Sequence, residues 1–341
     1  MDFPNEPGDK SRLFPDIAST GKKTKGQELP LVSVGIPTYN RPKELRIALE
    51  CIIAQTYTNL EIIVSDNCSP GNETEEVVQE FIKKDLRISY YRQPENRGPV
   101  FNMNFVLERS NGIYFMWAAD DDRFENNFIK ICLDQFISER DIVAVTTEAQ
   151  YFSENKKFEF FPEGEPFIAF TSEKAEDRLL YMLRYGYGNL FYSMYRRQTL
   201  VESGKTVYSR LSMTGLNEIP LFLLVIEQGN WRVLPRIGFF KKTTEPVFIQ
   251  ARWEMTGGFL AGHGFIRFFG QLKADFFYHY HSLTDINRAI SLLHIRNKWK
   301  LYLFTFWLLM KHFILLTLHY KPRIKTNFQS DKNLIHKQQL H

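Results

Sequence analysis

Short apolar segments alternate with segments of helical periodicity, and this alternation restricts the possible folds more than any other feature of the sequence. The segments of strand length lie at residues 31–36, 60–65, 88–91 and 113–118. Helical spacing of apolar side chains occupies the segments between them, at 42–53, 73–84 and 100–107. The pattern predicts an α/β layer on a mostly parallel sheet, with ligands beyond the carboxyl ends of the strands.

Charge is unevenly distributed along the 341 residues, whose formal net charge is +4. Residues 286–341 hold ten Lys or Arg and one acid, Asp331, so their balance is +9 and that of residues 1–285 is −5. A basic, aromatic tail on an acidic body favours contact with an anionic surface, either membrane or nucleic acid. A solvated basic terminus is the alternative.

Histidine and cysteine exclude several kinds of site. All eight histidines lie at or after His263, so the first 262 residues cannot form a histidine-ligated zinc site or a Ser/His dyad on their own. The three cysteines form no CxxC motif, which favours a reducing compartment. The first residues have no apolar signal segment, so we expect a cytoplasmic location.

Two acidic features follow predicted strands. Asp120, Asp121 and Asp122 come at the end of the fourth apolar segment, and adjacent carboxylates repel one another unless a cation neutralises them. Mg²⁺ or Mn²⁺, bound by one or two carboxylates and by phosphates, meets this need, although an acidic loop without a ligand is possible. Asp66 ends the second strand, where it would bind a ribose or a base, or form an Asx turn or helix cap.

Five short motifs resemble, in order and spacing, those of the family 2 glycosyltransferases. They are Val34–Arg41, Gln55–Tyr57, Glu61–Asn67, Glu95–Gly98 and Asp120–Asp122. The resemblance is strong over about residues 31–136 and weaker to about residue 228. It implies a GT-A fold, in which a mostly parallel nucleotide-binding sheet is flanked by helices and carries an acceptor-side extension.

The resemblance also implies a role for each matching position. The donor-binding residues would be Pro37, Thr38, Tyr39, Asn40, Arg41, Asp66, Asn96, Gly98, Asn104, Asp120 and Asp121. Asp66 would contact the base of the nucleoside. Asp120 and Asp122 match the outer acids of the family's DxD motif, which holds Mn²⁺ or Mg²⁺ together with the diphosphate and sugar of a donor of UDP or dTDP type.

Glu218 is the predicted general base. The family commonly places an acidic pair before an apolar helix here, with the second acid as the base, but in this chain Asn217 replaces the first acid and Glu replaces Asp. A carboxylate can accept the proton of an acceptor hydroxyl. The alternative is that Glu218 only stabilises the positive start of a helix.

The implied activity is metal-dependent, inverting transfer of a sugar to a hydroxyl of a glycan or lipid-linked saccharide, as in assembly of a bacterial surface polysaccharide. A sugar nucleotidyltransferase shares the architecture, but it usually has a Gly-rich, Arg-containing loop where this chain reads Pro37 to Pro42. An inactive module that binds nucleotide sugars is a further alternative, because the motif at Glu218 is altered.

The expected division of the chain has four parts. They are a disordered leader at 1–29, a catalytic domain at 30–246 with a donor half at 30–136 and an acceptor half at 137–246, a flexible loop and helical connection at 247–285, and a membrane-leaning tail at 286–341.

The tail contains a mostly apolar segment from Leu301 to Leu318, which is nearly long enough to span a bilayer. Polar residues recur in it every seven positions, at Lys298, Thr305, His312 and His319. This stripe favours an amphipathic helix on an anionic membrane, at the inner face of the plasma membrane. A spanning helix and packing on the protein body are the alternatives. Nucleic-acid binding is not expected, because basic residues do not interrupt the apolar segment.

Overall fold

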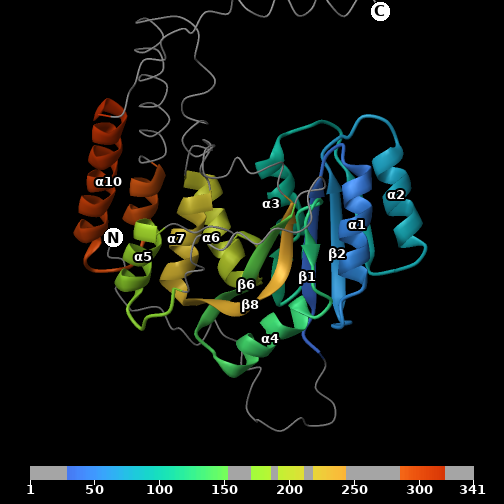
Figure 1. Ribbon diagram of the computed structural model, residues 1–341, viewed down its shortest axis with the longest axis horizontal. Coiled ribbons are helices and arrows are strands. Elements are labelled where there is room, and N and C mark those ends of the chain that lie inside the picture. The colour runs from blue at the N-terminus through green and yellow to red at the C-terminus, as the bar shows by residue number, and fades with distance from the viewer. Residues whose placement is uncertain (1–28, 153–169, 186–190, 211–217, 243–284, 319–341) are drawn as a thin grey trace, which may run out of the picture.

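The computed structural model describes residues 29–152, 170–185, 191–210, 218–242 and 285–318 (Figure 1). Within these ranges, strands form one mixed sheet in the order β3-β2-β1-β4-β7-β6-β8-β5. The strands are β1 Val32–Thr38, β2 Leu60–Asp66, β3 Ile88–Arg92, β4 Tyr114–Trp117, β5 Arg123–Phe124, β6 Ile142–Phe152, β7 Met194–Arg196 and β8 Asn230–Lys242. The four strands predicted in the first half are confirmed, and they pair in parallel.

The second half of the sheet is irregular. β7 lies antiparallel between β4 and β6, whereas β6 pairs in parallel with β8 through several register shifts. The short β5, which follows the Asp triplet, pairs antiparallel with the end of β8. This last pairing brings residues 240–242 beside the triplet, although they are more than a hundred positions away in the sequence.

Helices cover both faces of the sheet. They are α1 Pro42–Ile53, α2 Glu73–Ile82, α3 Pro99–Arg109, α4 Phe128–Ser138, α5 Ala175–Tyr185, α6 Arg197–Arg210, α7 Glu218–Gln228 and α10 Lys298–Leu318. Alternate residues of β2 point to opposite faces: Ile62 and Val64 pack in a core with α1, α2 and α4, while Ile63 packs in a core with α3 and α5 to α7. The result is a layer of helices on each side of the sheet.

Two glycines and two prolines position the loops at the carboxyl edge. Pro42 and Pro99 begin α1 and α3, where the fixed φ of proline suits the first turn. Gly98, just before α3, has φ +83°, a conformation that favours glycine. A Cβ on Gly35 of β1 would lie 2.6 Å from the Val106 side chain, so α3 packs directly on this strand.

α10 lies with α5 and α7 at the opposite end of the molecule from α1 and α2 (Figure 1). Leu301 of α10 belongs to the same core as α5 and α7, so this helix packs on the body. Among the described residues, no helix has the length and apolarity that a bilayer crossing requires. The leader predicted at 1–29 and most of the connection predicted at 247–285 lie outside the described residues.

Candidate functional site

A pocket of about 500 Å³ lies at the carboxyl edge of β1 and β4. The residues that line it and that the sequence predicted are Pro37, Thr38, Tyr39, Arg41, Asn96, Asp120, Asp121 and Asp122. The lining residues that sequence reasoning missed include Asn67, Asn102, Met103, Trp117, Lys241 and Lys242, and the aromatic residues Phe191 and Tyr192 line the pocket as well. Acidic, amide and basic side chains therefore line this pocket, and aromatic side chains line one part of its wall.

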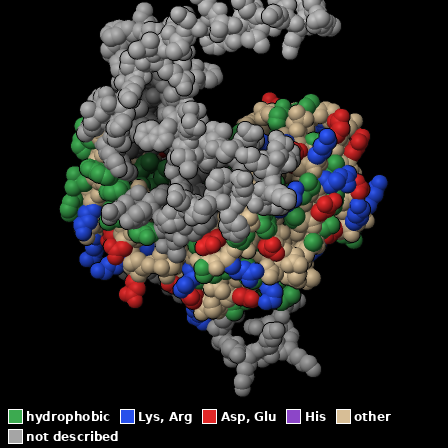
Figure 2. All heavy atoms as spheres, viewed as in Figure 1, with side chains coloured by type: hydrophobic (Ala, Val, Ile, Leu, Met, Phe, Trp, Pro, Cys, Tyr) green, Lys and Arg blue, Asp and Glu red, His purple; other side chains and the backbone are tan. Residues whose placement is uncertain are grey.

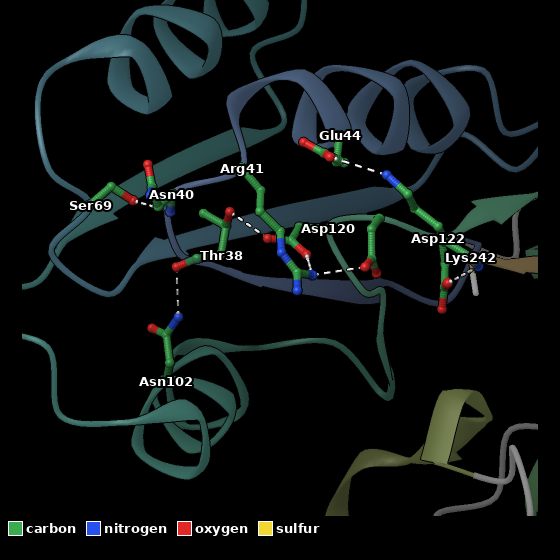
Figure 3. Close-up of polar contacts among 10 residues, drawn as sticks. Thr38, Asn40, Arg41, Glu44, Ser69, Asn102, Asp120, Asp122 and Lys242 are labelled. Atoms are coloured by element: carbon green, nitrogen blue, oxygen red, sulfur yellow. Dashed lines mark hydrogen bonds and ion pairs between the residues drawn. The ribbon is translucent and has the colours of Figure 1, made fainter. Parts of the chain in front are cut away.

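Asp120 is held by the loop that follows β1 (Figure 3). Its carboxylate accepts a hydrogen bond of 2.7 Å from the Thr38 hydroxyl. It also forms an ion pair with the Arg41 guanidinium at 3.1 Å. The same guanidinium pairs with Asp121 at 2.8 Å. Burial raises the pKa of Asp120, although the bonds from Thr38 and Arg41 oppose this effect. Arg41 is half exposed, so it lies where solvent or a ligand can reach it.

Asp122 is buried, with 2% of its surface exposed. Its Oδ1 accepts a hydrogen bond of 3.0 Å from the backbone N–H of Lys242, and the Lys242 ammonium pairs with Glu44 at 3.1 Å. Within the described part of the chain, Asp122 Oδ2 has no hydrogen-bond partner. Burial raises the pKa of Asp122 to about 7. A buried oxygen without a donor, next to two other carboxylates, fits a cation.

The number and type of side chains that could ligate a metal decide what kind of cation site this is. The described residues contain no group of three or more His, Cys, Asp or Glu arranged to hold a metal. Mg²⁺ and Mn²⁺ usually take one or two carboxylates and complete their coordination with phosphates and water. Asp120 and Asp122 fit that mode, in which the substrate supplies the missing oxygens.

Asn67 and Asn96 connect two loops on the other wall of the pocket. The Asn67 amide donates to Asn96 Oδ1 at 2.8 Å and to the Gly98 carbonyl at 3.1 Å, and its Oδ1 accepts from the Arg97 N–H at 3.1 Å. Asn96 Oδ1 also accepts from the Gly98 N–H at 2.9 Å. These bonds attach the loop before α3 to the loop after β2.

Asn102, rather than the predicted Asn104, lies at the pocket. It is buried, and it donates to the carbonyls of Ser65 at 2.8 Å and Thr38 at 3.3 Å. The two asparagines are two positions apart on α3, which separates them by about 200° around the helix axis. Because Asn102 faces the sheet, Asn104 is not among the lining residues.

Asp66 and Asn40 shape the loops and do not line the pocket. Asp66 Oδ1 accepts bonds from the Ser69 N–H at 2.8 Å and the Ser69 hydroxyl at 2.6 Å, and its Oδ2 accepts from the Tyr90 hydroxyl at 3.0 Å. This is the turn-forming arrangement that sequence reasoning named as the alternative. Asn40, at φ +55°, donates its N–H to the Ser69 hydroxyl at 2.7 Å. The contact of Asp66 with a base stays a prediction.

The sequence that forms this pocket is similar to a known protein family. Residues 33–199 match the family model described as glycosyl transferase family 2. This part of the chain is therefore similar to the family 2 glycosyltransferases. This match includes the pocket loops, α3, the Asp triplet and β7.

Relatives with known names match a shorter part of the chain. The GalNAc(5)-diNAcBac-PP-undecaprenol beta-1,3-glucosyltransferase of Campylobacter jejuni is 40% identical over 95 residues, which are 28% of this chain and 30% of that protein. Glycosyltransferase GlyG of Streptococcus pneumoniae is 30% identical over 138 residues, 40% of this chain and 45% of that protein. The chain therefore spans less than half the length of these curated relatives.

A solved structure extends the likeness to the fold. TarS residues 1–349 of S. aureus, in complex with UDP-GlcNAc, superpose with a TM-score of 0.59 at 15% sequence identity, covering 87% of this chain and 77% of that one. At this identity the comparison shows the fold alone, which is the GT-A fold predicted from the motifs.

The predicted acceptor side is only partly described. Glu218 is the first residue of α7, but its side chain lies outside the described residues. The described aromatic wall includes Trp117, whose ring stacks on Phe191 with centroids 4.6 Å apart. Tyr192 lies beside it, with the Lys241 ammonium 4.7 Å from its ring centroid. The sequence signal for this lysine is weak, since Lys241 and Lys242 only end a strand.

Proposed function

We propose that this protein transfers a sugar from a nucleotide-sugar donor to a hydroxyl of a glycan or lipid-linked saccharide, with inversion at the anomeric carbon. The observation that carries the proposal is the position of Asp120 and Asp122 in the pocket of a region similar to the family 2 glycosyltransferases. Oδ2 of Asp122 has no hydrogen-bond partner among the described residues, and an ion bound with the donor would be its partner.

Asp120 and Asp122 would hold Mn²⁺ or Mg²⁺. When bound, such an ion supplies charge neutralisation for the nucleoside diphosphate that leaves. Two proteins of related fold were solved with comparable ligands: TarS with UDP-GlcNAc, and GalNAc-T7 with UDP, GalNAc and Mn²⁺. They support a UDP-type donor for this chain.

The chain's own cations would bind the diphosphate. Arg41 is half exposed at the mouth of the pocket, and Lys241 lines the same cavity on the other side of the Asp triplet. Both are close enough to the triplet to affect its charges, since Arg41 pairs with Asp120 and Lys241 opposes the raised pKa of Asp122. Charge-assisted bonds from these groups are stronger than neutral ones, which favours their use on phosphate oxygens.

Glu218 would act as the general base of a single displacement. Its carboxylate would accept the hydroxyl proton while the acceptor oxygen forms a bond to the anomeric carbon. The bond from that carbon to the diphosphate oxygen breaks, and the nucleoside diphosphate leaves with the electron pair. This assignment is supported by the resemblance at residues 217–218 and by the place of Glu218 at the start of α7.

Release of nucleoside diphosphate tests the proposed transfer. The full chain is incubated with UDP-, dTDP- and GDP-sugars in the presence of Mn²⁺ or Mg²⁺. We expect hydrolysis of at least one donor, dependence on the ion, and loss of activity in Asp122→Asn. Asp134→Asn is the control, because Asp134 is an exposed aspartate on α4 that pairs with Lys130.

Other outcomes separate the competing functions. Pyrophosphate released from a nucleoside triphosphate and a sugar phosphate would identify a nucleotidyltransferase. Donor binding without turnover, with any acceptor saccharide offered, would identify an inactive module. Activity that survives both chelation and Asp122→Asn would contradict the metal-dependent mechanism.

The base assignment needs its own variant pair. Glu218→Gln should lower kcat by at least about a hundredfold while donor binding is kept, because general base catalysis contributes about 10²–10⁴. Glu108→Gln changes an exposed glutamate on α3 and should leave kcat unchanged. Near-normal turnover of Glu218→Gln would refute the assignment.

A lipid-linked acceptor would place this reaction at the cytoplasmic face of the plasma membrane, with the protein bound peripherally through its C-terminal region. The C. jejuni relative is named for an undecaprenol-linked saccharide, and this name supports the location. The balance of +9 in residues 286–341 supports it as well, because anionic lipids attract basic segments.

A further inference from the structure

The polar side of α10 faces the protein. Thr305 is buried, and its hydroxyl donates a hydrogen bond of 3.0 Å to the Asn287 side chain. The Lys298 ammonium donates to the Ser291 carbonyl at 2.8 Å. Leu301 is buried on the same side, within the core that includes α5 and α7. The two described residues of the seven-residue polar stripe therefore contact the segment just before α10, with Thr305 buried and Lys298 partly exposed.

The opposite side of α10 is apolar and exposed. We call it the outer face, and it consists of Trp299, Leu303, Phe306, Trp307 and Met310, whose exposed fractions run from 40% to 61%. The intervals between these residues place them along one side of a helix. They make up five of the eleven large exposed hydrophobic residues that the structure describes. A continuous apolar patch of this kind marks an interaction surface.

Basic side chains accompany the outer face. Arg296 and Lys300 are exposed at its beginning, and the Lys300 ammonium lies 5.9 Å from the ring centroid of Trp299. The sequence has no Asp or Glu from residue 286 to residue 330. Figure 2 shows hydrophobic side chains at the edge of the molecule where α10 lies, with basic side chains next to them. The charge of this surface is complementary to an anionic partner.

We propose that the outer face of α10 docks into the headgroup region of an anionic bilayer. Two tryptophans beside basic residues match the composition of interfacial helices, in which amphipathic rings lie at the headgroup level. A second copy of this chain is a poorer occupant, because α10 carries no acid to pair with the cations of its partner. The proposal deepens the peripheral location of the proposed function, but it does not require the transfer reaction.

Vesicle cosedimentation of the full chain tests this surface. We expect binding to vesicles of phosphatidylcholine with phosphatidylglycerol, weaker binding to phosphatidylcholine alone, and partial release by salt. Trp299→Ala combined with Phe306→Ala should weaken binding at least about tenfold, because two aromatic side chains no longer insert. Arg296→Gln combined with Lys300→Gln should weaken binding to the anionic vesicles about thirtyfold at low salt.

Controls separate docking from folding and from catalysis. Leu86→Ala removes a highly exposed leucine in the turn between α2 and β3 and should leave vesicle binding unchanged. The thermal unfolding temperature and donor hydrolysis of the Trp299/Phe306 variant should match those of the wild type, since neither residue lines the pocket. Vesicle binding needs no turnover, so a failure of the proposed function would leave this result intact.

Three results would overturn the proposal. They are absence of binding to anionic vesicles, equal binding by wild type and the Trp299/Phe306 variant, and a dimer in solution that this variant dissociates. The last result would assign the outer face to a second copy of the chain.

Discussion

Asp122→Asn should make the metal-free protein more stable at pH 8 while it abolishes metal-dependent donor hydrolysis. Asparagine has the shape of aspartate, and its Oδ1 can keep the hydrogen bond from the Lys242 backbone N–H. The substitution removes a buried carboxylate, one oxygen of which accepts no hydrogen bond from the residues that the structure describes. It also removes the ligand that a divalent ion would need.

The magnitude follows from the pKa of Asp122, which burial raises from 3.8 to about 7. A group whose pKa is raised on folding binds its proton more tightly in the native state, so stability falls as pH rises from about 4 to about 7. Ionisation of this carboxylate then costs at most about 4 kcal/mol above pH 7. The Asn side chain leaves a buried N–H₂ without a partner, which costs about 1–3 kcal/mol. We expect a net gain of about 1–3 kcal/mol at pH 8.

Urea denaturation at pH 5 and pH 8, with chelator present, measures this gain. At pH 5 the wild-type carboxyl is protonated, so the advantage of the variant should disappear or reverse. Asp134→Asn, at an exposed position, should behave like the wild type at both pH values. The reasoning would be refuted if the variant were less stable than the wild type at pH 8, or if the difference between the two proteins did not depend on pH.

The metal site, the arginine beside it and the packing of α3 on β1 lead to three further predictions. Because burial raises the pKa of Asp122 to about 7, protons compete with the ion, so the apparent affinity for Mn²⁺ should fall about tenfold per pH unit below pH 7 and level off above it, as titration calorimetry would show. Arg41→Gln should raise the donor KM at least about tenfold but lower stability by less than about 1 kcal/mol, since its ion pairs are half exposed; equal KM values would contradict its role. Gly35→Ala should lower the free energy of unfolding by about 1–3 kcal/mol, because its Cβ would lie 2.6 Å from Val106; an unchanged urea midpoint would show that α3 moves freely.

Local sequence predicts the first half of the fold well, because β1, β2 and β4 are buried on both faces and therefore have mostly apolar sequences. Residues 60–65 and 113–118 were predicted in this way, and the structure has β2 and β4 there. The second half is different. The insertion of β7 between β4 and β6, and the irregular pairing of β6 with β8, depend on contacts between distant segments. No periodicity within a short window carries that information.

The residues of the site also fall into those that local sequence predicts and those that depend on contacts between distant segments. Asp120 to Asp122 could be predicted because unfavourable repulsion among neighbouring carboxylates is visible in the sequence itself. Lys241 and Lys242 could not, since they reach the pocket only through the pairing of β5 with the end of β8. Residues 102 and 104 show a third kind of limit: both are asparagines on α3, and only the packing of that helix decides which one faces the sheet.

α10 shows why a helical pattern alone does not identify the face that meets solvent. The seven-residue spacing correctly groups Lys298 with Thr305, but a grouping does not state which side is inside. Thr305 can be buried because Asn287, in the segment just before α10, accepts its hydrogen bond. The large apolar residues then have to point outward, where water does not stabilise them. A helix that satisfies its polar groups internally and exposes its aromatic rings is suited to a less polar environment than water, and the bilayer interface provides one.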